Sequence, residues 1–482
     1  MRLRTLLYCT GVLLIPGILL GCTSAPEAQR DARTRVERVL AERLSVSAED
    51  LPPDDQPDAI SATVRELLQS PLTEESAIRI ALLNHRGLSA ALRGLGVPAA
   101  ELVQAGLLTN PILSGNAKFF DGGTEIELGL SQSFLDVFYR PLRRHVAAAA
   151  LAAAEARVAS EVISSVFETR RAFLDLQAAR ALVEIQTAFL DAEDAALVLM
   201  SELHRAGNVT DPMLTAAQAA HARARLELAM TEAAARELRE PLQVLLGLWG
   251  AETAWTSNDA TDIFQTDPRS GLDLADLESR AVSASLDLAE AAAEVAAAAQ
   301  RAGLASWEGV LPSADLGVAA KRESPSGDWG LGPAFAIGLP VLDPGRARTA
   351  AAEAALRQAM DAYHQEAVEV RSAARTFRER LIAVDDAARY LRDVDLPLRS
   401  RLVLETLQNF NGMQIGVFEV LLVKQQEIGS RRDLLEMARE ARHARLDLEE
   451  LLAGCLNHER LADHPDVAPH TENTTNQGGH GS

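Results

Sequence analysis

The spacing of apolar residues changes twice along the chain, in the same order each time. Residues 72–111 carry apolar side chains at helical spacing and end at Pro111, after which apolar and polar side chains alternate. The same change follows residues 272–312, about 200 positions later, as expected of an internal repeat. Alternation with period two is typical of strands, and we expect β-hairpins over 112–132 and 313–340.

Each expected hairpin leads into a long helical segment. The first runs from Pro141, a residue type favoured at helix starts, to Ala206, and contains no glycine. A helix of this length would span on the order of 100 Å. We predict helical hairpins over 141–248 and 344–454, with kinks at Pro241 and Pro397.

Alanine is abundant in both long helices, especially over 147–154 and 347–355. Such small side chains let helices approach closely, but a helix this long cannot bury its apolar stripe within one compact domain. The pattern therefore predicts partner helices and an oligomer.

The N-terminal residues indicate export. Arg2 and Arg4 precede an apolar run that is too short for a membrane-spanning helix and is typical of a signal peptide. The run ends in Leu19-Leu20-Gly21-Cys22, which resembles a bacterial lipobox. By this resemblance the chain is cut before Cys22 and acylated there, and Thr23 favours the outer membrane. The alternative is an ordinary signal peptide that ends by chance in a cysteine.

Composition limits the partners and the reactions. Removal of residues 1–21 leaves 47 − 2 = 45 basic residues against 68 acidic ones, a formal charge of −23, which disfavours binding to nucleic acid. Cys455 would be the one unmodified cysteine, so no intramolecular disulfide is expected. No later segment is apolar enough for a transmembrane helix, so any membrane crossing must use strands.

The chain thus contains two copies of one unit, which consists of a helical segment, a strand hairpin and a long helical hairpin. This order of elements resembles the TolC-like outer-membrane factor family. It resembles in particular the lipoprotein members that serve resistance-nodulation-division pumps. The similarity covers about residues 70–455, through segments such as Gln104–Pro111, Phe134–Arg144, Arg205–Val209 and Ile415–Leu421. The resemblance also orders the chain into units. These are a signal peptide (1–21), a lipidated extension (22–70), a first repeat (71–250), a linker (251–271), a second repeat (272–455) and a disordered tail (456–482).

The family resemblance implies a mainly α fold with a small β part. Long antiparallel helices of three protomers would form a periplasmic α-barrel, and four strands from each would close a barrel of twelve strands in the outer membrane. It also implies a passive exit duct that works with a membrane-fusion adaptor and an inner-membrane pump. The lipid on Cys22, expected to include palmitate, is the only cofactor implied.

The resemblance also suggests functional residues. Glu419 stands where family members carry an acidic residue at the closed periplasmic tip, whereas Leu422 replaces a second acid found in some of them. Three copies of Glu419 could attract cations, or Glu419 could be an ordinary solvated glutamate. The turns with Gly207, Asp211, Gly412 and Gly416 are candidate adaptor contacts, although Asp211 could also be a local helix cap.

Two further possibilities remain open from the sequence. His458, His464, His470 and His480 lie in the last 25 residues and are weak metal-binding candidates, but a plain flexible tail is the favoured explanation. We find no arrangement of nucleophile, base and orienting group, so no enzymatic activity is expected. The alternatives to an efflux duct are a type I protein secretion duct and a lipid-tethered periplasmic coiled-coil scaffold.

Overall fold

The computed structural model describes residues 24–44, 50–52, 57–121, 123–257, 267–323 and 327–462. The proposed signal peptide, Cys22, His464, His470 and His480 lie outside these residues. In the described part of the chain, no helix is both long and apolar enough to cross a bilayer.

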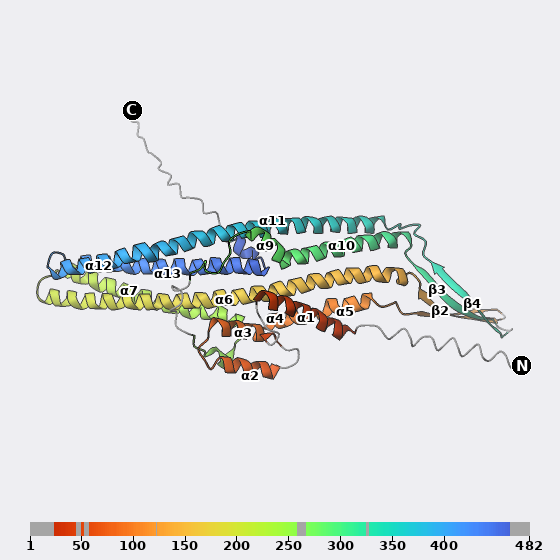
Figure 1. Cartoon of the computed structure of the whole chain (residues 1–482). Coiled ribbons are helices and arrows are strands. Elements are labelled where there is room, and N and C mark those ends of the chain that lie inside the picture. Colours follow the sequence, from red (N-terminus) through yellow and green to blue (C-terminus); the bar gives the residue numbers. More distant parts are fainter. Residues whose placement is uncertain are drawn as a thin grey trace, which may run out of the picture.

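The molecule is a long rod of helices with a β-sheet at one end and two helical turns at the other (Figure 1). The rod is built on α6 (Asp136–Arg205), a helix of 70 residues. Four further segments run beside it and complete two helical hairpins. These are α7 (Asp211–Glu237), α11 (Arg346–Tyr390), α12 (Leu396–Asn411) and α13 (Val417–Ala453).

Both predicted kinks coincide with interruptions of the helix. The helix before Pro241 ends at Glu237, and α8 (Arg239–Leu245) continues in a separate segment. Before Pro397, residues Leu391–Asp395 form a π-helix, which is the kind of local defect that accompanies a lost backbone hydrogen bond.

The shorter helices before each hairpin are interrupted at equivalent positions. The first set is α3 (Glu74–Asn84), α4 (Arg86–Gly94) and α5 (Gly96–Ala105), and the second is α9 (Leu277–Ala284) and α10 (Leu286–Val310). His85 and Ser285 separate helices in the two sets, and their φ and ψ angles are −68° and 114° for His85 and −61° and 121° for Ser285. The shared extended residue is direct structural support for the duplication.

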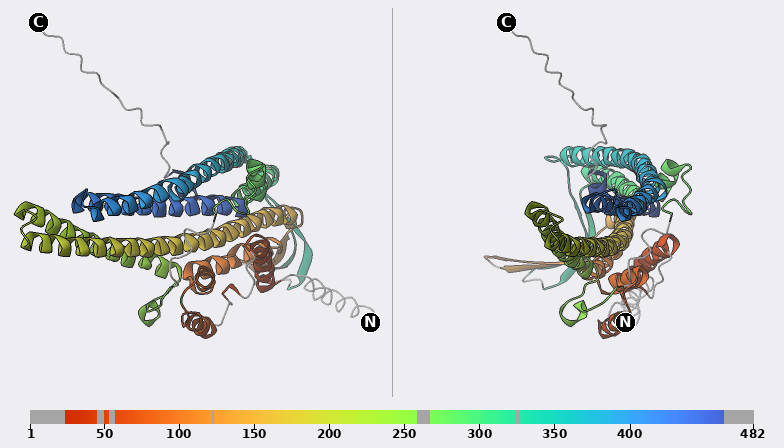
Figure 2. Two further views of the ribbon diagram at one scale, coloured as in Figure 1. Left: turned by 60° about the vertical axis from the view of Figure 1, so that its left-hand side comes forward. Right: turned by 90° about the vertical axis from the view of Figure 1, so that its left-hand side faces the viewer.

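The N-terminal extension is helical and packs against the first repeat. It contains α1 (Ala25–Leu44) and α2 (Pro57–Leu67), which lie with α3 to α5 on one side of the long helices (Figure 2). Arg43 at the end of α1 donates hydrogen bonds to the carbonyl oxygens of Ala284 and Ala453, at 2.5 and 2.7 Å. One guanidinium thus satisfies terminal carbonyls of two helices, α9 and α13.

Two boundaries differ from the sequence prediction. Helix α6 begins at Asp136, so Pro141 lies inside the helix. The carboxylate of Asp136 accepts a hydrogen bond from the backbone N–H of Thr109 and pairs with Arg143, at 2.8 Å each, which fixes the helix start earlier. Residues His458–Ala462 form helix α14, so the prediction that the whole tail from 456 is disordered was wrong at its beginning.

The four strands form one antiparallel sheet in the order β1-β2-β3-β4. Strands β1 (Ile112–Phe120) and β2 (Gly123–Ser133) make the first hairpin, and β3 (Ala314–Glu323) and β4 (Trp329–Ile337) make the second. Strand β2 pairs with β3 over nine residues, from Glu125 opposite Glu323 to Ser133 opposite Asp315. The two repeats therefore share a single sheet instead of forming separate hairpins.

The helices pack through small side chains. Helices α10 and α13 each lie against both α6 and α11, so each helix joins the two repeats. Many of the buried residues in these contacts are alanines, which allow close approach of the helix axes. They include Ala153, Ala156, Ala159, Ala297, Ala298, Ala373, Ala374, Ala438, Ala441 and Ala444.

A buried ionic cluster also links α6 to α13. Arg171 is 3% exposed and pairs with Asp447 at 2.8 Å and with Glu450. Burial is the main cause that raises the pKa of Glu450 to about 7, against the ordinary 4.5, and the charge of Arg171 only partly opposes it. Ionisation of Glu450 therefore destabilises the folded state.

This cost predicts a pH dependence of stability. Because the folded pKa is raised, the protonated carboxyl stabilises the fold below pH 4.5, and this contribution is lost as the pH rises through about 7. The loss amounts to at most about 3 kcal/mol. In thermal unfolding followed by circular dichroism, Glu450→Gln should remove part of the fall in Tm between pH 5 and 8. Exposed Glu436→Gln on the same helix should leave that fall unchanged, and equal profiles for wild type and Glu450→Gln would contradict this account.

Candidate channel elements at the two ends of the molecule

One face of the sheet is apolar and exposed. Residues directly opposite one another point to the same face, so the register places Leu130, Val318 and Pro333 in one row and Leu128, Ala320 and Leu331 in the next. Large apolar side chains on this face are well exposed, from 38% for Ile126 to 81% for Phe119. This is the reverse of a soluble sheet, in which the apolar face is the buried one.

The opposite face carries polar and small side chains. Glu125 forms ion pairs with Lys118 at 3.3 Å and with Lys321 at 3.1 Å, and Lys321 also pairs with Glu323 at 2.8 Å. Glu127 and Asp315 add further acidic groups, and most other positions on this face are serine, asparagine, glycine or alanine. On the apolar face the charged exception among the paired residues is Arg322, opposite Ile126 near the far tip.

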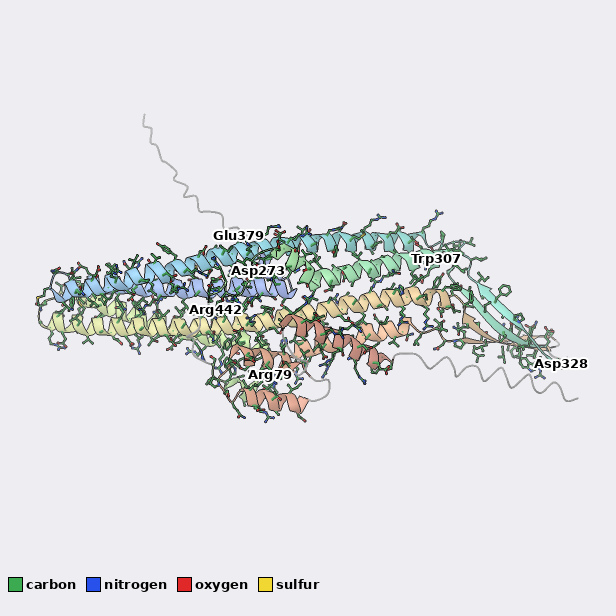
Figure 3. All side chains as sticks on the ribbon, viewed as in Figure 1. Arg79, Asp273, Trp307, Asp328, Glu379 and Arg442 are labelled. Atoms are coloured by element: carbon green, nitrogen blue, oxygen red, sulfur yellow. The ribbon has the colours of Figure 1, made fainter. Side chains whose placement is uncertain are left out.

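Aromatic side chains stand at both ends of the sheet. Trp307 lies where α10 approaches the strands, and Asp328 lies at the far tip (Figure 3). Trp307, Phe134 and Phe138 are exposed at the helical end, and Trp329 is exposed beside the far tip. Aromatic residues at both borders of an apolar band are typical of the two interfaces of a membrane.

The outer strands β1 and β4 each pair on one side only in the described part of the chain. Their other edges leave backbone N–H and C=O groups without strand partners. Free edges of this length favour pairing with another chain.

The two turns at the far end of the rod have the same backbone shape. In the first, the N–H groups of Gly207 and Asn208 bond to the carbonyls of His204 and Leu203, and in the second Met413 and Gln414 bond to Phe410 and Asn409. Gly207 has φ +76° and Met413 has φ +56°, the left-handed conformation that ends many helices. Thr210 and Gly416 then precede the returning helices with φ and ψ of −87° and 163°, and −84° and 163°.

By backbone conformation, Gly412 is therefore not the counterpart of Gly207. Gly412, with φ −78° and ψ 4°, matches Ala206, with φ −80° and ψ −2°, and Met413 takes the place of Gly207. Met413 is 95% exposed, yet it occupies a conformation that usually requires glycine. Sequence reasoning missed it because the adjacent Gly412 appeared to be the turn residue.

Asp211 is the first residue of α7 and follows the N-cap residue Thr210. Its carboxylate lies 2.7 Å from Nε2 of His204 at the end of α6 and is 90% exposed. The pair joins the two helices across the turn.

Glu419 lies in the first turn of α13, three residues after Gly416, and is exposed. Leu422, one turn further, is also exposed. Within a single chain Glu419 and the four proposed turn residues thus gather at one end of the rod. His458, by contrast, lies on α14, where it faces Glu366 and Glu369 of α11.

Residues 113–248 match the sequence family described as "Outer membrane efflux protein". The whole fold is similar to that of CusC, with a TM-score of 0.65 and 17% identity over 80% of this chain and 92% of CusC. The chain therefore has the fold of CusC. No curated protein matches it in sequence.

Two further outer-membrane proteins have a similar fold. VceC from Vibrio cholerae has a TM-score of 0.64 and 17% identity, over 83% of this chain and 97% of VceC. The open state of the MtrE outer membrane channel from Neisseria gonorrhoeae has a TM-score of 0.64 and 15% identity, over 80% of this chain and 89% of MtrE. The expected mainly α fold with a small antiparallel sheet is thereby confirmed.

Substitutions in the two turns test the assignment of the left-handed positions. Gly207→Ala should destabilise the first turn by about 1 kcal/mol because a Cβ is strained at positive φ, and Met413→Gly should stabilise the second turn by a similar amount. Gly416→Ala is the matched control, because its φ is ordinary and its Cβ would meet no atom within 4 Å. Amide hydrogen exchange at the turns would measure the changes, and an effect of Gly416→Ala as large as that of Gly207→Ala would argue against this assignment.

Proposed function

We propose that three copies of this chain form a passive exit duct through the outer membrane of a Gram-negative bacterium, as part of a tripartite efflux system. The observation that carries the proposal is the sheet, which has an exposed apolar face, a polar face and two unpaired edges at one end of a long helical rod. The helices would extend the same duct into the periplasm. Small molecules or metal ions would leave through it.

Closure of the sheet supports the trimer. Strand β4 of one copy would pair with β1 of the next, so that every edge is satisfied and the apolar face meets lipid. A scaffold that kept the strands in water would instead leave the apolar face unburied. Burying one leucine or phenylalanine stabilises by about 1.5–3 kcal/mol, so the loss would be on the order of 10 kcal/mol per chain.

The turns at Gly207, Asp211, Gly412 and Gly416 would face a membrane-fusion adaptor that connects the duct to an inner-membrane pump. Three chains would present six turns, and all six would share the backbone shape described above. One adaptor surface could therefore engage either repeat. The duct itself would supply no energy.

Cys22 would carry the lipid that anchors the mature chain to the outer membrane. Several acyl chains on one residue give stable attachment, whereas a single chain is marginal. Intact-mass analysis of the protein extracted from membranes tests this assignment, and an unmodified Cys22 would rule it out.

Adjacent positions on β3 test the proposed orientation of the sheet. Val318→Arg would place a charge against lipid and should cost about 2–4 kcal/mol near the bilayer centre, which would reduce inserted trimer and conductance in planar bilayers. The Ala319→Arg variant, with its charge on the polar face, should still assemble and conduct, and its ion selectivity should shift toward anions. Equal tolerance of both arginines would contradict a lipid-facing surface.

We further propose that three Glu419 carboxylates narrow the tip and bind cations. Like charges held close together favour counter-ion binding. Glu419→Gln should weaken block of single-channel current by divalent cations at least about tenfold, if the ions bind mainly by this charge. Glu405→Gln, an exposed change on α12, is the control, and unchanged block in Glu419→Gln would remove the idea.

A further inference from the structure

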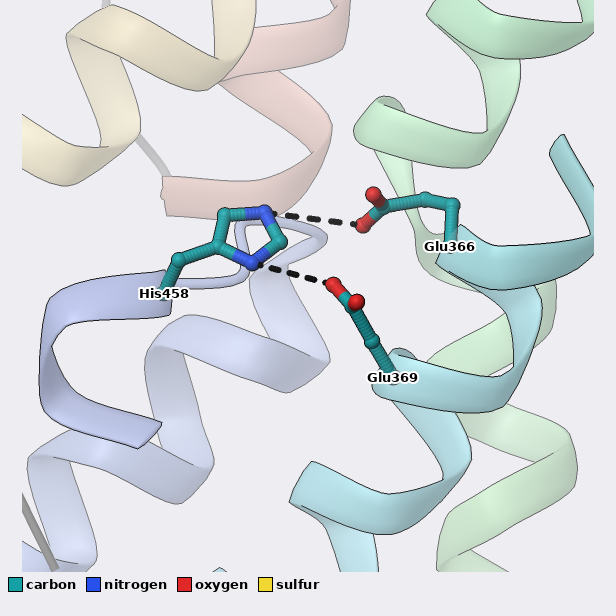
Figure 4. Close-up of side chains that lie close together, drawn as sticks. All are labelled: Glu366, Glu369 and His458. Carbon is teal, nitrogen blue, oxygen red and sulfur yellow. Dashed lines mark ion pairs between the residues drawn. The ribbon is translucent and has the colours of Figure 1, made fainter. Parts of the chain in front are cut away.

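A cluster of three metal-ligating side chains lies far from both proposed functional ends. His458 comes from α14, the short helix that follows α13, and Glu366 and Glu369 come from consecutive turns of α11. The three side chains converge between the two helices (Figure 4). None of the duct functions described above requires this grouping.

The distances suit a shared ligand. Each residue offers a nitrogen or oxygen atom, and these three atoms all lie within 4.8 Å of one another. Nδ1 of His458 is 3.2 Å from a carboxylate oxygen of Glu369, and Nε2 is 3.8 Å from Oε1 of Glu366. Only one imidazole nitrogen can bind a given ion, so a bound metal would replace one of these two pairings. Zinc binds nitrogen and oxygen ligands at about 2.0–2.2 Å, and one ligand atom from each residue can reach a common ion after side-chain rotation.

The two glutamates differ in their remaining contacts. Oε1 of Glu369 accepts a hydrogen bond from Gln365 at 2.6 Å, which leaves Oε2 directed at His458. Oε1 of Glu366 is buried and has no hydrogen-bond partner among the described residues. A buried carboxylate oxygen without a donor is costly and calls for a compensating cation or proton.

The surroundings favour a cation. The carboxylates of Asp287, Glu369 and Glu290 lie close enough to Glu366 to interact with it electrostatically, so negative charge accumulates around the cluster. Some of this negative charge is already neutralised, since Glu290 pairs with Arg157. Among the described residues, the one cationic group paired with Glu366 and Glu369 is His458.

We propose that His458, Glu366 and Glu369 form a binding site for a divalent transition-metal ion of the Zn²⁺ class. An imidazole nitrogen with two carboxylates suits such an ion better than Mg²⁺ or Ca²⁺, which prefer oxygen ligands alone. His458 is 55% exposed, so water can complete the coordination. This site is independent of the proposed duct.

A bound ion would fasten the chain end to the second repeat. Helix α14 otherwise contacts this region through apolar packing, in which Leu456 is buried and Leu461 is partly buried beside α11 and α13. A metal that joins His458 to α11 would reinforce that contact. It would also bind poorly at acid pH, because the imidazole must be neutral to coordinate.

Zinc titration of the full chain in detergent tests the site, with a fluorescent chelator as competitor. His464, His470 and His480 are first replaced by alanine, so that the remaining tail histidines cannot contribute. We expect one Zn²⁺ per chain in this background, and at least tenfold weaker binding after His458→Ala or Glu369→Gln. Co²⁺ should show visible absorption that the same two substitutions abolish.

His221→Ala is the matched control, because His221 pairs with the single carboxylate of Asp194 on other helices. It should leave Zn²⁺ affinity unchanged, and circular dichroism should show the same helix content in every variant. Absence of saturable Zn²⁺ binding in the tail-substituted background would overturn the proposal. Binding that survives both His458→Ala and Glu369→Gln would overturn it equally, since the ion would then sit elsewhere.

Discussion

Backbone hydrogen bonding at the edges of the sheet is the constraint on which the proposed assembly depends. Within the described part of the chain, strands β1 and β4 each have one edge without a strand partner, and the sheet between them exposes its apolar side chains. In lipid the N–H and C=O groups of such edges have no water to bond with, so an open sheet is not viable there. Pairing between copies would give the edge N–H and C=O groups hydrogen-bond partners. The closed sheet could then lie in the membrane with its apolar face against lipid.

The helical rod is held together by side-chain packing between the two repeats. Alanine-rich contacts bring α10 and α13 against both α6 and α11, and the paired strands β2 and β3 unite the repeats at the opposite end. Buried ion pairs of Arg171 with Asp447 and Glu450 also join the repeats, and the raised pKa of Glu450 indicates that keeping its carboxylate charged is costly. The same duplicated backbone then supplies two nearly identical turns at the tip.

Much of this fold could be predicted from local pattern. The strands follow from period-two alternation, and the interruptions near Pro241 and Pro397 follow from proline geometry. The start of α6 could not be predicted in this way, because Asp136 is fixed by Thr109, which is 27 positions away in the sequence. The tail composition likewise concealed α14, whose Leu461 gains its partners only from the folded second repeat.

Prediction of the functional residues was less complete for the same reason. The tip residues were located through glycines, but the left-handed position of the second turn is held by Met413, which has no such signature. His458 was noted only as part of a histidine-containing tail. Its two glutamates come from a helix about 90 positions earlier, so nothing in the local sequence links the three residues.

Disulfide trapping between strand edges tests the trimer most directly. Cysteine at Asn116 on β1 would be combined in turn with cysteine at Gly330, Gly332 or Ala334 on β4, all on the polar face. Buried Cys455 should not interfere, since burial raises its pKa to about 12. A cysteine pair at Glu127 and Lys321, which are opposite each other within one chain, is the control. The account predicts that one of the β1 and β4 cysteine pairs gives covalent trimers, which identifies the preferred register. If the control pair forms its disulfide within one chain but every β1 and β4 pair gives only monomers, the account is contradicted.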